Sequence, residues 1–402
     1  MKRFLILLGF VATMAIMLPS AGLTEEEKKK KFEFSGDLRG RIESFRFSED
    51  ETGAKKDSRR RIRYRLRLNL KANLNPHAVA RVQVGTGDLD HRSGNQTLGS
   101  PFDFAPNEFD VRQAYLIFMP YANGQLPNDK GDWALQFGRV PNPFLWKNGK
   151  DIMLWDSDIN PAGVSTTFGL DVGQSATTFA NAAYFVIEEK SAESDPYLAA
   201  LQIGAGGGQK DGVQAGIRGT VYVFDNLDSP FIKRGVDSTG ARTSSGGNIP
   251  DGLTGSITGG DMTVVGTQAY VKTKKWKLLA YGGYSNNLSA EPSQLFPGVG
   301  KESIGYNFGI EGGDKKKVVR IGGCYYYLEA NAFPSQFIDS DLLEGHTNRK
   351  GSMVYLTRYL FKGVDFKFTG LASDAIETSS DFAESVRNSE RVRFILDLVY
   401  KF

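Results

Sequence analysis

Apolar and polar residues alternate strictly along the stretch from Arg61 to Leu74. The apolar positions are Ile62, Tyr64, Leu66, Leu68, Leu70, Ala72 and Leu74. The positions between them are Arg61, Arg63, Arg65, Arg67, Asn69, Lys71 and Asn73. A period of two predicts a β-strand with two unlike faces, because a helical wheel would scatter the arginines over every side. The run exceeds the usual strand of a soluble sheet and is long enough to cross a bilayer at a tilt, which takes about nine to eleven residues.

The two faces of this strand call for two different solvents. One arginine on a lipid-facing surface at the bilayer midplane costs roughly 2–4 kcal/mol, and a ladder of several would cost on the order of 10 kcal/mol. The leucine face is therefore expected to meet lipid and the arginine face to meet water. A closed barrel offers both environments and pairs every backbone group. The alternative is a long solvated hairpin arm in a soluble sheet protein.

Strand-like segments recur to the end of the chain, and the connections between them alternate short and long. The short connections include 273–275, 312–316 and 362–363, and the long ones are 225–262, 286–300, 329–349 and 373–390. Short turns on one rim and long loops on the other are typical of outer-membrane barrels. We therefore predict an all-β fold over residues 32–402, a closed antiparallel transmembrane β-barrel of about 16 strands, with 14 or 18 also compatible, short periplasmic turns and long extracellular loops. The glycine run Gly204–Gly208 is expected to form a periplasmic turn.

The first part of the chain follows a different pattern. A basic start leads into an apolar run from Phe4 to Leu18, and the small residues Ser20–Gly22 suit a cleavage site. Residues 1–22 therefore look like a secretory signal peptide. Residues 23–31 are expected to form a short charged periplasmic lead-in.

Assigning faces strand by strand places more basic than acidic side chains inside the predicted barrel. The predicted pore-lining ladder is Arg39, Arg41, Arg61, Arg63, Arg65, Arg67, Lys71 and Arg81. Further inward basic positions are Arg218, Arg320, Arg358, Lys367 and Arg393, and the inward acids include Asp37, Glu43, Glu311, Asp365 and Asp397. A lumen with excess positive charge concentrates anions, since low-dielectric walls focus the field. Alternatively, acidic loops fold inside, pair with these arginines and form a structural plug.

The segment 140–163 is the strongest candidate for such a loop. It is too rich in proline for a central strand and too aromatic for a fully exposed loop. We predict that it folds into the barrel as a constriction loop, with a surface loop on the barrel rim as the alternative. Its charged residues are Lys147, Lys150, Asp151, Asp156 and Asp158.

A metal site is not expected in this segment. Asp156-x-Asp158-x-Asn160 is superficially similar to a calcium loop, but Pro161 stands where the sixth-position glycine belongs. Thr167 stands where the twelfth-position glutamate belongs. We predict no metal and no cofactor.

Catalytic chemistry is not expected either. The three histidines, His77, His91 and His346, are far apart in the sequence, whereas hydrolases need a nucleophile or acid beside a placed histidine. Cys324 is the single cysteine, so no intrachain disulfide can form, and a structural thiol is expected. The net charge of +3 does not identify a partner, and nothing indicates nucleic acid.

Aromatic residues are expected to mark the membrane interface. Tyr325, Tyr327, Tyr355 and Tyr359 suit an interfacial girdle on the outer wall. The last strand is predicted to present a lipid-facing row to the end of the chain, namely Phe394, Leu396, Leu398, Tyr400 and Phe402.

The chain resembles the Gram-negative "putative porin" family, relatives of the phosphate-selective porins. The resemblance rests on the signal peptide, the Arg-x-Arg-x-Arg strand (61–70), the segments 137–144 and 155–163, and the terminal Phe402. Its sharpest motifs lie before Gly163. It implies passive diffusion through a sixteen-stranded pore that is often trimeric. It also implies that Tyr400 and Phe402 form a C-terminal assembly signal, read by the barrel assembly machinery.

We therefore expect an outer-membrane porin for passive diffusion of small hydrophilic solutes, with anions preferred through the arginine-lined lumen. The expected partners are outer-membrane lipid and lipopolysaccharide, the assembly machinery, small hydrophilic or anionic solutes, and further copies of the chain in a homotrimer. One alternative is a substrate-specific channel for phosphate or an acidic saccharide. Others are an adhesin or structural barrel, and a barrel hydrolase.

Overall fold

The computed structural model describes most of the predicted barrel. The described residues are 31–47, 58–87, 92–99, 109–120, 133–145, 155–173, 175–191, 194–209, 212–227, 248, 261–275, 277–292, 300–342, 345–376 and 390–402. The predicted signal peptide (1–22) and all but Lys31 of the predicted lead-in (23–31) lie outside them. Among the described residues, no helix has the length and apolar character needed to cross a membrane.

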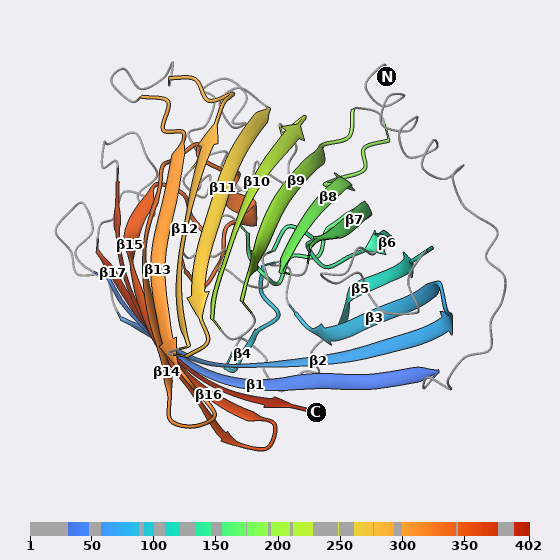
Figure 1. Ribbon diagram of the computed structural model, residues 1–402. Coiled ribbons are helices and arrows are strands. Elements are labelled where there is room, and N and C mark those ends of the chain that lie inside the picture. The colour runs from blue at the N-terminus through green and yellow to red at the C-terminus, as the bar shows by residue number, and fades with distance from the viewer. Residues whose placement is uncertain are drawn as a thin grey trace.

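Antiparallel strands form one closed ring (Figure 1). The strands are β1 (Phe32–Phe47), β2 (Arg59–Asn75), β3 (Ala78–Thr86), β4 (Gln96–Thr97), β5 (Phe109–Phe118), β6 (Trp133–Arg139), β7 (Ala162–Val172), β8 (Ala176–Val186), β9 (Tyr197–Gly208), β10 (Val213–Asp225), β11 (Met262–Thr273), β12 (Leu278–Asn287), β13 (Ile304–Gly313), β14 (Arg320–Leu328), β15 (Arg349–Phe361), β16 (Val364–Ala375) and β17 (Arg391–Lys401). The described part of the chain contains seventeen strands, and β4 is a two-residue strand beside β2. The other sixteen form the barrel, which confirms the predicted fold class.

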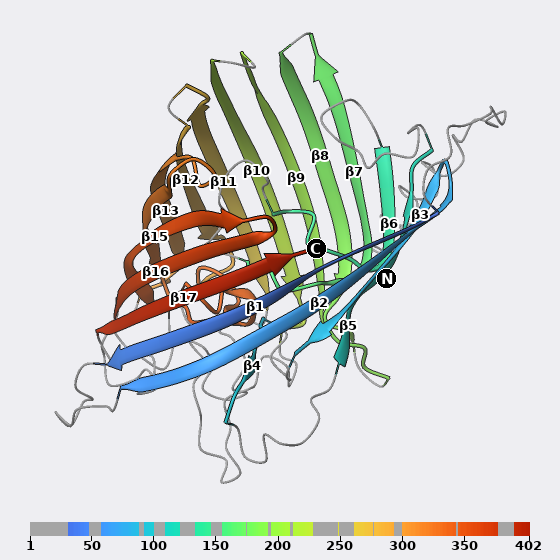
Figure 2. The ribbon, with the colours of Figure 1, turned by 90° about the horizontal axis from the view of Figure 1, so that it is seen from below.

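The ring closes where the ends of the chain meet. β1 pairs with β2 on one side and with β17 on the other, and Figure 2 shows these three strands side by side. The backbone of Phe402 accepts from the Gly36 amide at 3.0 Å and donates to the Gly36 carbonyl at 3.1 Å. The terminal strand therefore leaves no open sheet edge, which removes the unpaired backbone groups that lipid could not satisfy.

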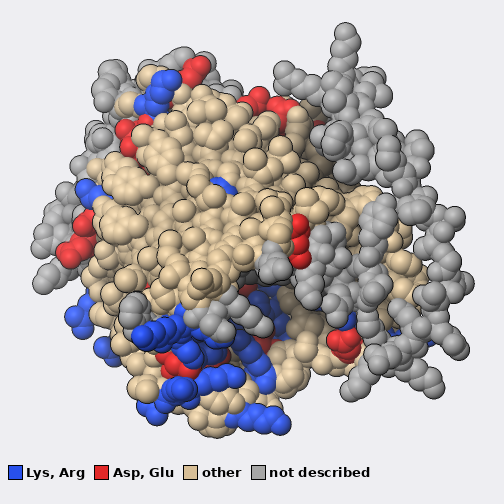
Figure 3. Space-filling model, viewed as in Figure 1, with Lys and Arg blue, Asp and Glu red and all other residues tan. Residues whose placement is uncertain are grey.

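The outer and inner faces of the arginine-rich strands differ as the alternation predicts. Leu38, Ile42 and Ile62 expose 46%, 53% and 54% of their surface, whereas Arg41 and Arg63 expose 3% and 7%. Figure 3 shows an outer wall almost free of charged side chains above a basic lower edge. The apolar residues face outward because only the interior provides partners for the guanidinium groups.

The glycine run in β9 does not form a turn, so that prediction is wrong. β9 continues through this run to Gly208. Gly206 and its cross-strand neighbour Gly216 leave space for the inward ring of Tyr270, since a Cβ on Gly216 would lie 2.5 Å from that ring. The glycines therefore serve ring packing rather than chain reversal.

Three further face assignments were wrong. Tyr355 pairs with Gly322 on the inner face and donates a hydrogen bond to Glu311, so it does not join an outer girdle. Tyr359 lies four residues after Tyr355 and therefore shares its inner face, since side chains alternate between the two faces of a strand. Arg358, predicted inward, is exposed on the outer face between Leu356 and Leu360.

Tyr325 and Tyr327 do lie on the outer wall. Tyr327 stacks on Tyr306 with ring centroids 5.0 Å apart, and Tyr325 packs against Phe308 at 5.5 Å. Their neighbours Cys324 and Tyr326 are buried inside, as the alternation requires.

Replacing Gly216 by valine should destabilise the barrel, because the new side chain would force the buried Tyr270 ring out of its site. Overpacking of this kind costs about 1–3 kcal/mol of unfolding free energy. The temperature at which the folded, fast-migrating gel band is lost should fall. Gly40→Val is the control, since nothing lies within 4 Å of a Cβ there. An equal effect in both variants would contradict the packing role of Gly216.

Candidate functional site

The register between β1 and β2 places arginines directly opposite one another. Arg39 lies opposite Arg65, and Arg41 lies opposite Arg63. Like charges at such positions repel, and all four side chains are buried. This arrangement therefore needs carboxylates between the guanidinium groups.

Acids on the strands supply part of that charge. Asp37 accepts from Arg65 and from Arg67, each at 2.8 Å. Asp397 on β17 accepts from Arg41 at 2.6 Å. The inner face of these strands therefore holds both the basic ladder and the first carboxylates that neutralise it.

Glu43 joins three strands near the loop-bearing rim. It accepts from Arg61 on β2, and from Arg393 on β17 at 2.9 Å. The Phe45 ring lies between these two guanidinium groups, with Arg61 at 5.0 Å and Arg393 at 4.7 Å from the ring centroid. Phe45 therefore adds cation–π contacts to the two arginines that Glu43 binds.

Loop residues supply the remaining acids. Asp158, from the β6–β7 loop, lies 3.2 Å from Arg67 and 3.6 Å from Arg65. Asp341, from the β14–β15 loop, accepts from Arg41 at 2.7 Å and lies 3.2 Å from Arg393. Two loops that join opposite parts of the ring therefore reach the same ladder.

An aromatic core holds these loops inside the barrel. Trp155 exposes 1% of its surface, and its ring centroid lies 5.1 Å from Phe337, 5.6 Å from Phe333 and 5.9 Å from Tyr222. Phe337 belongs to a short 3₁₀ helix, η1 (Ser335–Phe337). Burial of such rings removes a large apolar area from water, so the loops pack against the wall and against each other.

Backbone contacts join the two loops and a third segment. The Asp156 amide donates to the Phe337 carbonyl at 2.8 Å, and the Ser340 amide donates to Asp156 Oδ2 at 2.8 Å. Arg92, which follows β3, donates to the Ser335 and Gly345 carbonyls at 3.3 and 3.0 Å. We call the meeting of segments 92–97, 155–160 and 333–342 the loop junction.

A bulge in β5 aims two consecutive residues at this junction. The pairing with β3 skips Arg112, so Arg112 and Gln113 both face inward. Arg112 donates to the Asp158 carbonyl at 3.3 Å, and Gln113 donates to Asn160 Oδ1 at 2.8 Å. The bulge thereby anchors the segment that carries Asp158.

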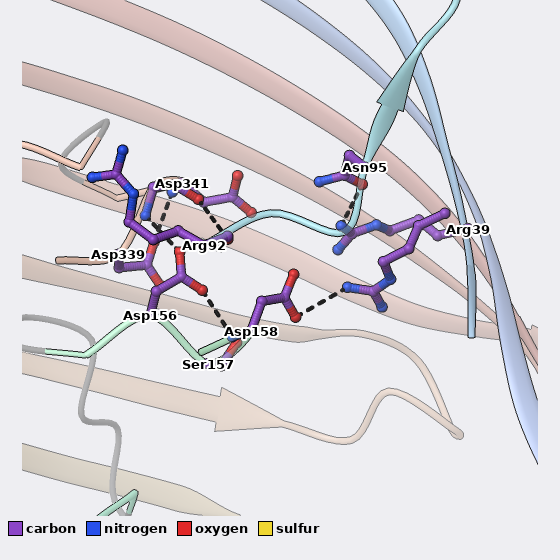
Figure 4. A pocket seen from close by; sticks show the side chains of 10 residues that line it. Arg39, Arg92, Asn95, Asp156, Ser157, Asp158, Asp339 and Asp341 are labelled. Atoms are coloured by element: carbon purple, nitrogen blue, oxygen red, sulfur yellow. Dashed lines mark hydrogen bonds and ion pairs between the residues drawn. The ribbon is translucent and has the colours of Figure 1, made fainter. Parts of the chain in front are cut away.

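A polar pocket of about 40 Å³ lies between the ladder and the loop junction (Figure 4). It is lined by Arg39, Arg65, Arg92, Asn95, Asp156, Ser157, Asp158, Asp339, Ser340 and Asp341. Arg39 donates from Nη2 to Asn95 Oδ1 at 2.5 Å, and its buried Nε has no hydrogen-bond partner. No ion pair joins Arg39 to any residue that the structure describes. The pocket thus contains one guanidinium with unused capacity for an anion.

The pocket acids divide into two kinds. Burial raises the pKa of Asp156 well above its usual value, and the neighbouring charges of Asp339 and Asp158 add to that rise. Burial also raises the pKa of Asp339, to about 6, with a further contribution from Asp341. Burial opposes ionisation of Asp341 too, but the charges of Arg41 and Arg393 outweigh it and lower its pKa well below the usual value. Arg65 and Arg67 likewise lower the pKa of Asp158 against burial.

The structure brings most of the predicted site residues together. Arg39 and Arg65 line the pocket together with Asp156 and Asp158, and Arg67 pairs with Asp158. Arg41 pairs with Asp341, and Arg63 donates to the Asn95 carbonyl. Arg61 instead donates to Glu43 on β1. Lys71 is apart from them, paired with Glu33 at 2.8 Å, and Arg81 lies opposite Lys71 on β3. The predicted residues Lys147, Lys150 and Asp151 lie outside the described residues.

Sequence reasoning did not identify Asp339 and Asp341. The available signal was the same combination that marked the earlier loop, because Phe333, Phe337 and Ile338 make the 333–342 segment too apolar for an exposed loop. Within the described residues, no group of His, Cys, Asp and Glu side chains is arranged to hold a metal ion.

Replacing Trp155 by alanine should loosen the loop junction. Replacing a buried tryptophan by alanine costs about 3–5 kcal/mol of stability. Here the lost contacts are those that hold the loops together. We expect larger and noisier single-channel conductance with the barrel still folded. Trp133→Phe serves as the control, because Trp133 lies on β6 and donates to Thr166 at 2.7 Å, outside the junction. Unchanged conductance in both variants would show that Trp155 does not hold the loops.

The junction should be tighter at about pH 5 than at about pH 7.5. The raised pKa of Asp339 stabilises the packed loop fully below 3.8, and that contribution is lost as the pH rises through about 6. Hydrogen exchange of the 333–342 amides, corrected for intrinsic rates, should therefore be severalfold slower at the lower pH. Asp339→Asn should reduce this difference, because Asp156 alone then contributes to it, and Asp314→Asn, in a distant turn, should leave it unchanged. Equal protection at both pH values would contradict the prediction.

Comparison with known proteins supports an outer-membrane channel. Residues 51–242 match a family model described as putative porin, whereas none of the curated proteins matches the chain. Among solved structures, the high-pH structure of Pseudomonas putida OprB is 8% identical with a TM-score of 0.53, covering 92% of this chain and 94% of that one. The outer membrane channel DcaP of Acinetobacter baumannii is 13% identical with a TM-score of 0.50, covering 92% and 97%.

The Salmonella typhi OmpF complex with daunomycin is 12% identical with a TM-score of 0.50, again covering 92% and 97%. At such identities the structural likeness shows the fold. Together with the family match, it indicates an outer-membrane location and a channel rather than an enzyme. Residues 51–242 thus match the family model described as putative porin, and the barrel that they help to build has the fold of these solved outer-membrane barrels.

Proposed function

We propose that the protein is a passive diffusion channel for small hydrophilic solutes, and that surplus guanidinium charge at the loop junction makes it prefer anions. The observation that carries this proposal is Arg39, a buried guanidinium that faces the pocket and has no carboxylate partner among the described residues. Most other ladder arginines at this level share a carboxylate. A solute anion would supply what Arg39 lacks.

The acids around the pocket weaken this preference only in part. Asp158 and Asp341 remain ionised but are already committed to two arginines each. Asp156 and Asp339 bind protons more readily than ordinary carboxyls, which reduces the negative charge that they present. The net field at the junction is therefore positive, and the low-dielectric wall concentrates it.

The ladder continues from the pocket toward the periplasmic turns. Arg67 and Lys71 expose 24% and 26% of their side chains, so they remain accessible to water in the lumen. Residues on one face of a strand follow one another at about 6.6 Å, a spacing that lets an anion pass from one cation to the next. Charge complementarity and pore width would decide the flux, without covalent chemistry.

A substrate-specific channel for phosphate or an acidic saccharide is the second candidate. The observation in its favour is the small pocket itself, because Arg39 and Arg92 offer planar guanidinium groups beside Asn95. Such a site would bind one anion at a time. Saturable block of the conductance by the bound anion would distinguish it from general diffusion.

The outer wall and the end of β17 suit the partners of a porin. The apolar outer wall would contact outer-membrane lipid and lipopolysaccharide, and a homotrimer would cover part of it. Tyr400 and Phe402 stack with centroids 5.8 Å apart and are both exposed at the end of β17, which suits a signal for the barrel assembly machinery.

The reversal potential of the reconstituted protein under a salt gradient tests the anion preference. Arg39→Gln should lower the anion-to-cation permeability ratio roughly twofold, because it removes the positive charge that no described carboxylate neutralises. Asp158→Asn should raise the ratio, because it removes one of the two carboxylates that Arg65 and Arg67 share, leaving only Asp37. Arg46→Gln, an exposed rim residue, is the control.

Three outcomes would contradict the proposal. Cation preference in the wild type would mean that the loop carboxylates dominate the pore. A ratio that Arg39→Gln and Asp158→Asn leave unchanged would place the ladder outside the conducting path. No steady conductance would indicate a plugged, adhesive or structural barrel.

A further inference from the structure

Basic side chains gather at one sector of the periplasmic rim, below strands β13 to β16. The exposed members are Lys316 and Lys317 in the β13–β14 turn, Arg358 on β15, and Lys362 in the β15–β16 turn. We call these four residues the basic rim. Figure 3 shows Lys and Arg side chains gathered at the lower edge of the same face.

The acids near the basic rim already have other partners. Asp314 accepts from Lys277 Nζ and from the Lys316 amide at 2.9 Å, and these contacts lower its pKa to about 2. Asp365 accepts from Lys315 at 2.7 Å. No ion pair joins any of the four basic-rim residues to another residue that the structure describes. Their positive charge is therefore not neutralised locally.

Exposed apolar residues lie among these cations. Val318 and Phe361 expose 65% and 64% of their surface. Arg358 points away from the lumen, between Leu356 and Leu360 on the lipid-facing side of β15. Lysine and arginine side chains in such surroundings keep their stems in the apolar layer and place their charge at the interface.

The neighbouring β11–β12 turn is also basic, with Lys274, Lys275 and Lys277 exposed, but the charge does not extend around the whole described rim. The β7–β8 turn, where Gly173 and Ser175 are described, carries no basic residue there, and the strand before it ends near Asp171. The described part of this rim is therefore more basic below β11 to β16 than at the β7–β8 turn.

We propose that the basic rim binds the phosphodiester headgroups of anionic phospholipids in the inner leaflet of the outer membrane. The outward direction of Arg358 and the exposed Val318 and Phe361 favour a lipid over a soluble anion, because a lipid offers both a phosphate and an apolar surface. Guanidinium and ammonium groups at the level of the headgroups bind phosphate oxygens with charge-assisted hydrogen bonds. Each added basic residue near an anionic surface strengthens such binding severalfold.

Native mass spectrometry of the purified full chain in detergent tests this site with phosphatidylglycerol, phosphatidylcholine and inorganic phosphate as probes. The wild type should retain phosphatidylglycerol in preference to phosphatidylcholine. A variant with Lys316, Lys317, Arg358 and Lys362 changed to Gln should lose roughly tenfold of that preference. The matched control changes Arg46, Arg59, Arg60 and Lys301 to Gln, which removes the same charge from the opposite rim.

Arg358→Gln alone provides a second variant that removes no internal contact, in case the fourfold variant does not fold. It should lose a severalfold share of the preference. An undiminished preference in both basic-rim variants, or an equal loss in the opposite-rim control, would overturn the proposal. Competition by inorganic phosphate at the same concentration as the lipid would also overturn it and would indicate a soluble-anion site. None of these outcomes depends on the ion selectivity of the pore.

Discussion

Repulsion between arginines on adjacent strands is the constraint on which the interior of this barrel depends. The strand pairing that seals the ring also sets Arg39 against Arg65 and Arg41 against Arg63. These groups cannot move apart, because the register is fixed by the apolar outer face. Carboxylates must therefore reach them, and they arrive from the strands themselves, through Asp37, Glu43 and Asp397, and from two loops, through Asp158 and Asp341.

The loops reach the ladder because two kinds of contact act together. Aromatic rings around Trp155 hold the loops within the barrel without specifying where each polar group lies. The ion pairs and backbone hydrogen bonds of Asp156, Asp158 and Ser340 then fix that position. Since a buried charge is costly unless it is paired, the ladder and the loops order each other.

The outer surface faces lipid rather than water, and its side chains are therefore mostly apolar. Apolar side chains cover the wall, and the charges gather at its edges, where lipid headgroups and water begin. Arg358 shows how the two environments meet, because it stands on the lipid side of its strand but close to the periplasmic end. At that depth an outward arginine costs about 0–1 kcal/mol, so its position needs no internal counter-charge.

The sequence by itself determined the barrel, its two faces and the rims, because a period of two exposes alternate side chains to opposite solvents over every strand. Local alternation also predicted that the ladder arginines of β1 and β2 face the interior of the barrel. It could not show that Arg358 lies on the outer face and Tyr355 on the inner face, the reverse of what was predicted for each. A face is assigned correctly only when the strand register is known. Nor could it join Asp158 to Asp341, because residues almost two hundred positions apart meet only when the ring closes and brings their loops together. The tertiary structure alone decided which arginines are neutralised and that Arg39 is left with an amide as its partner.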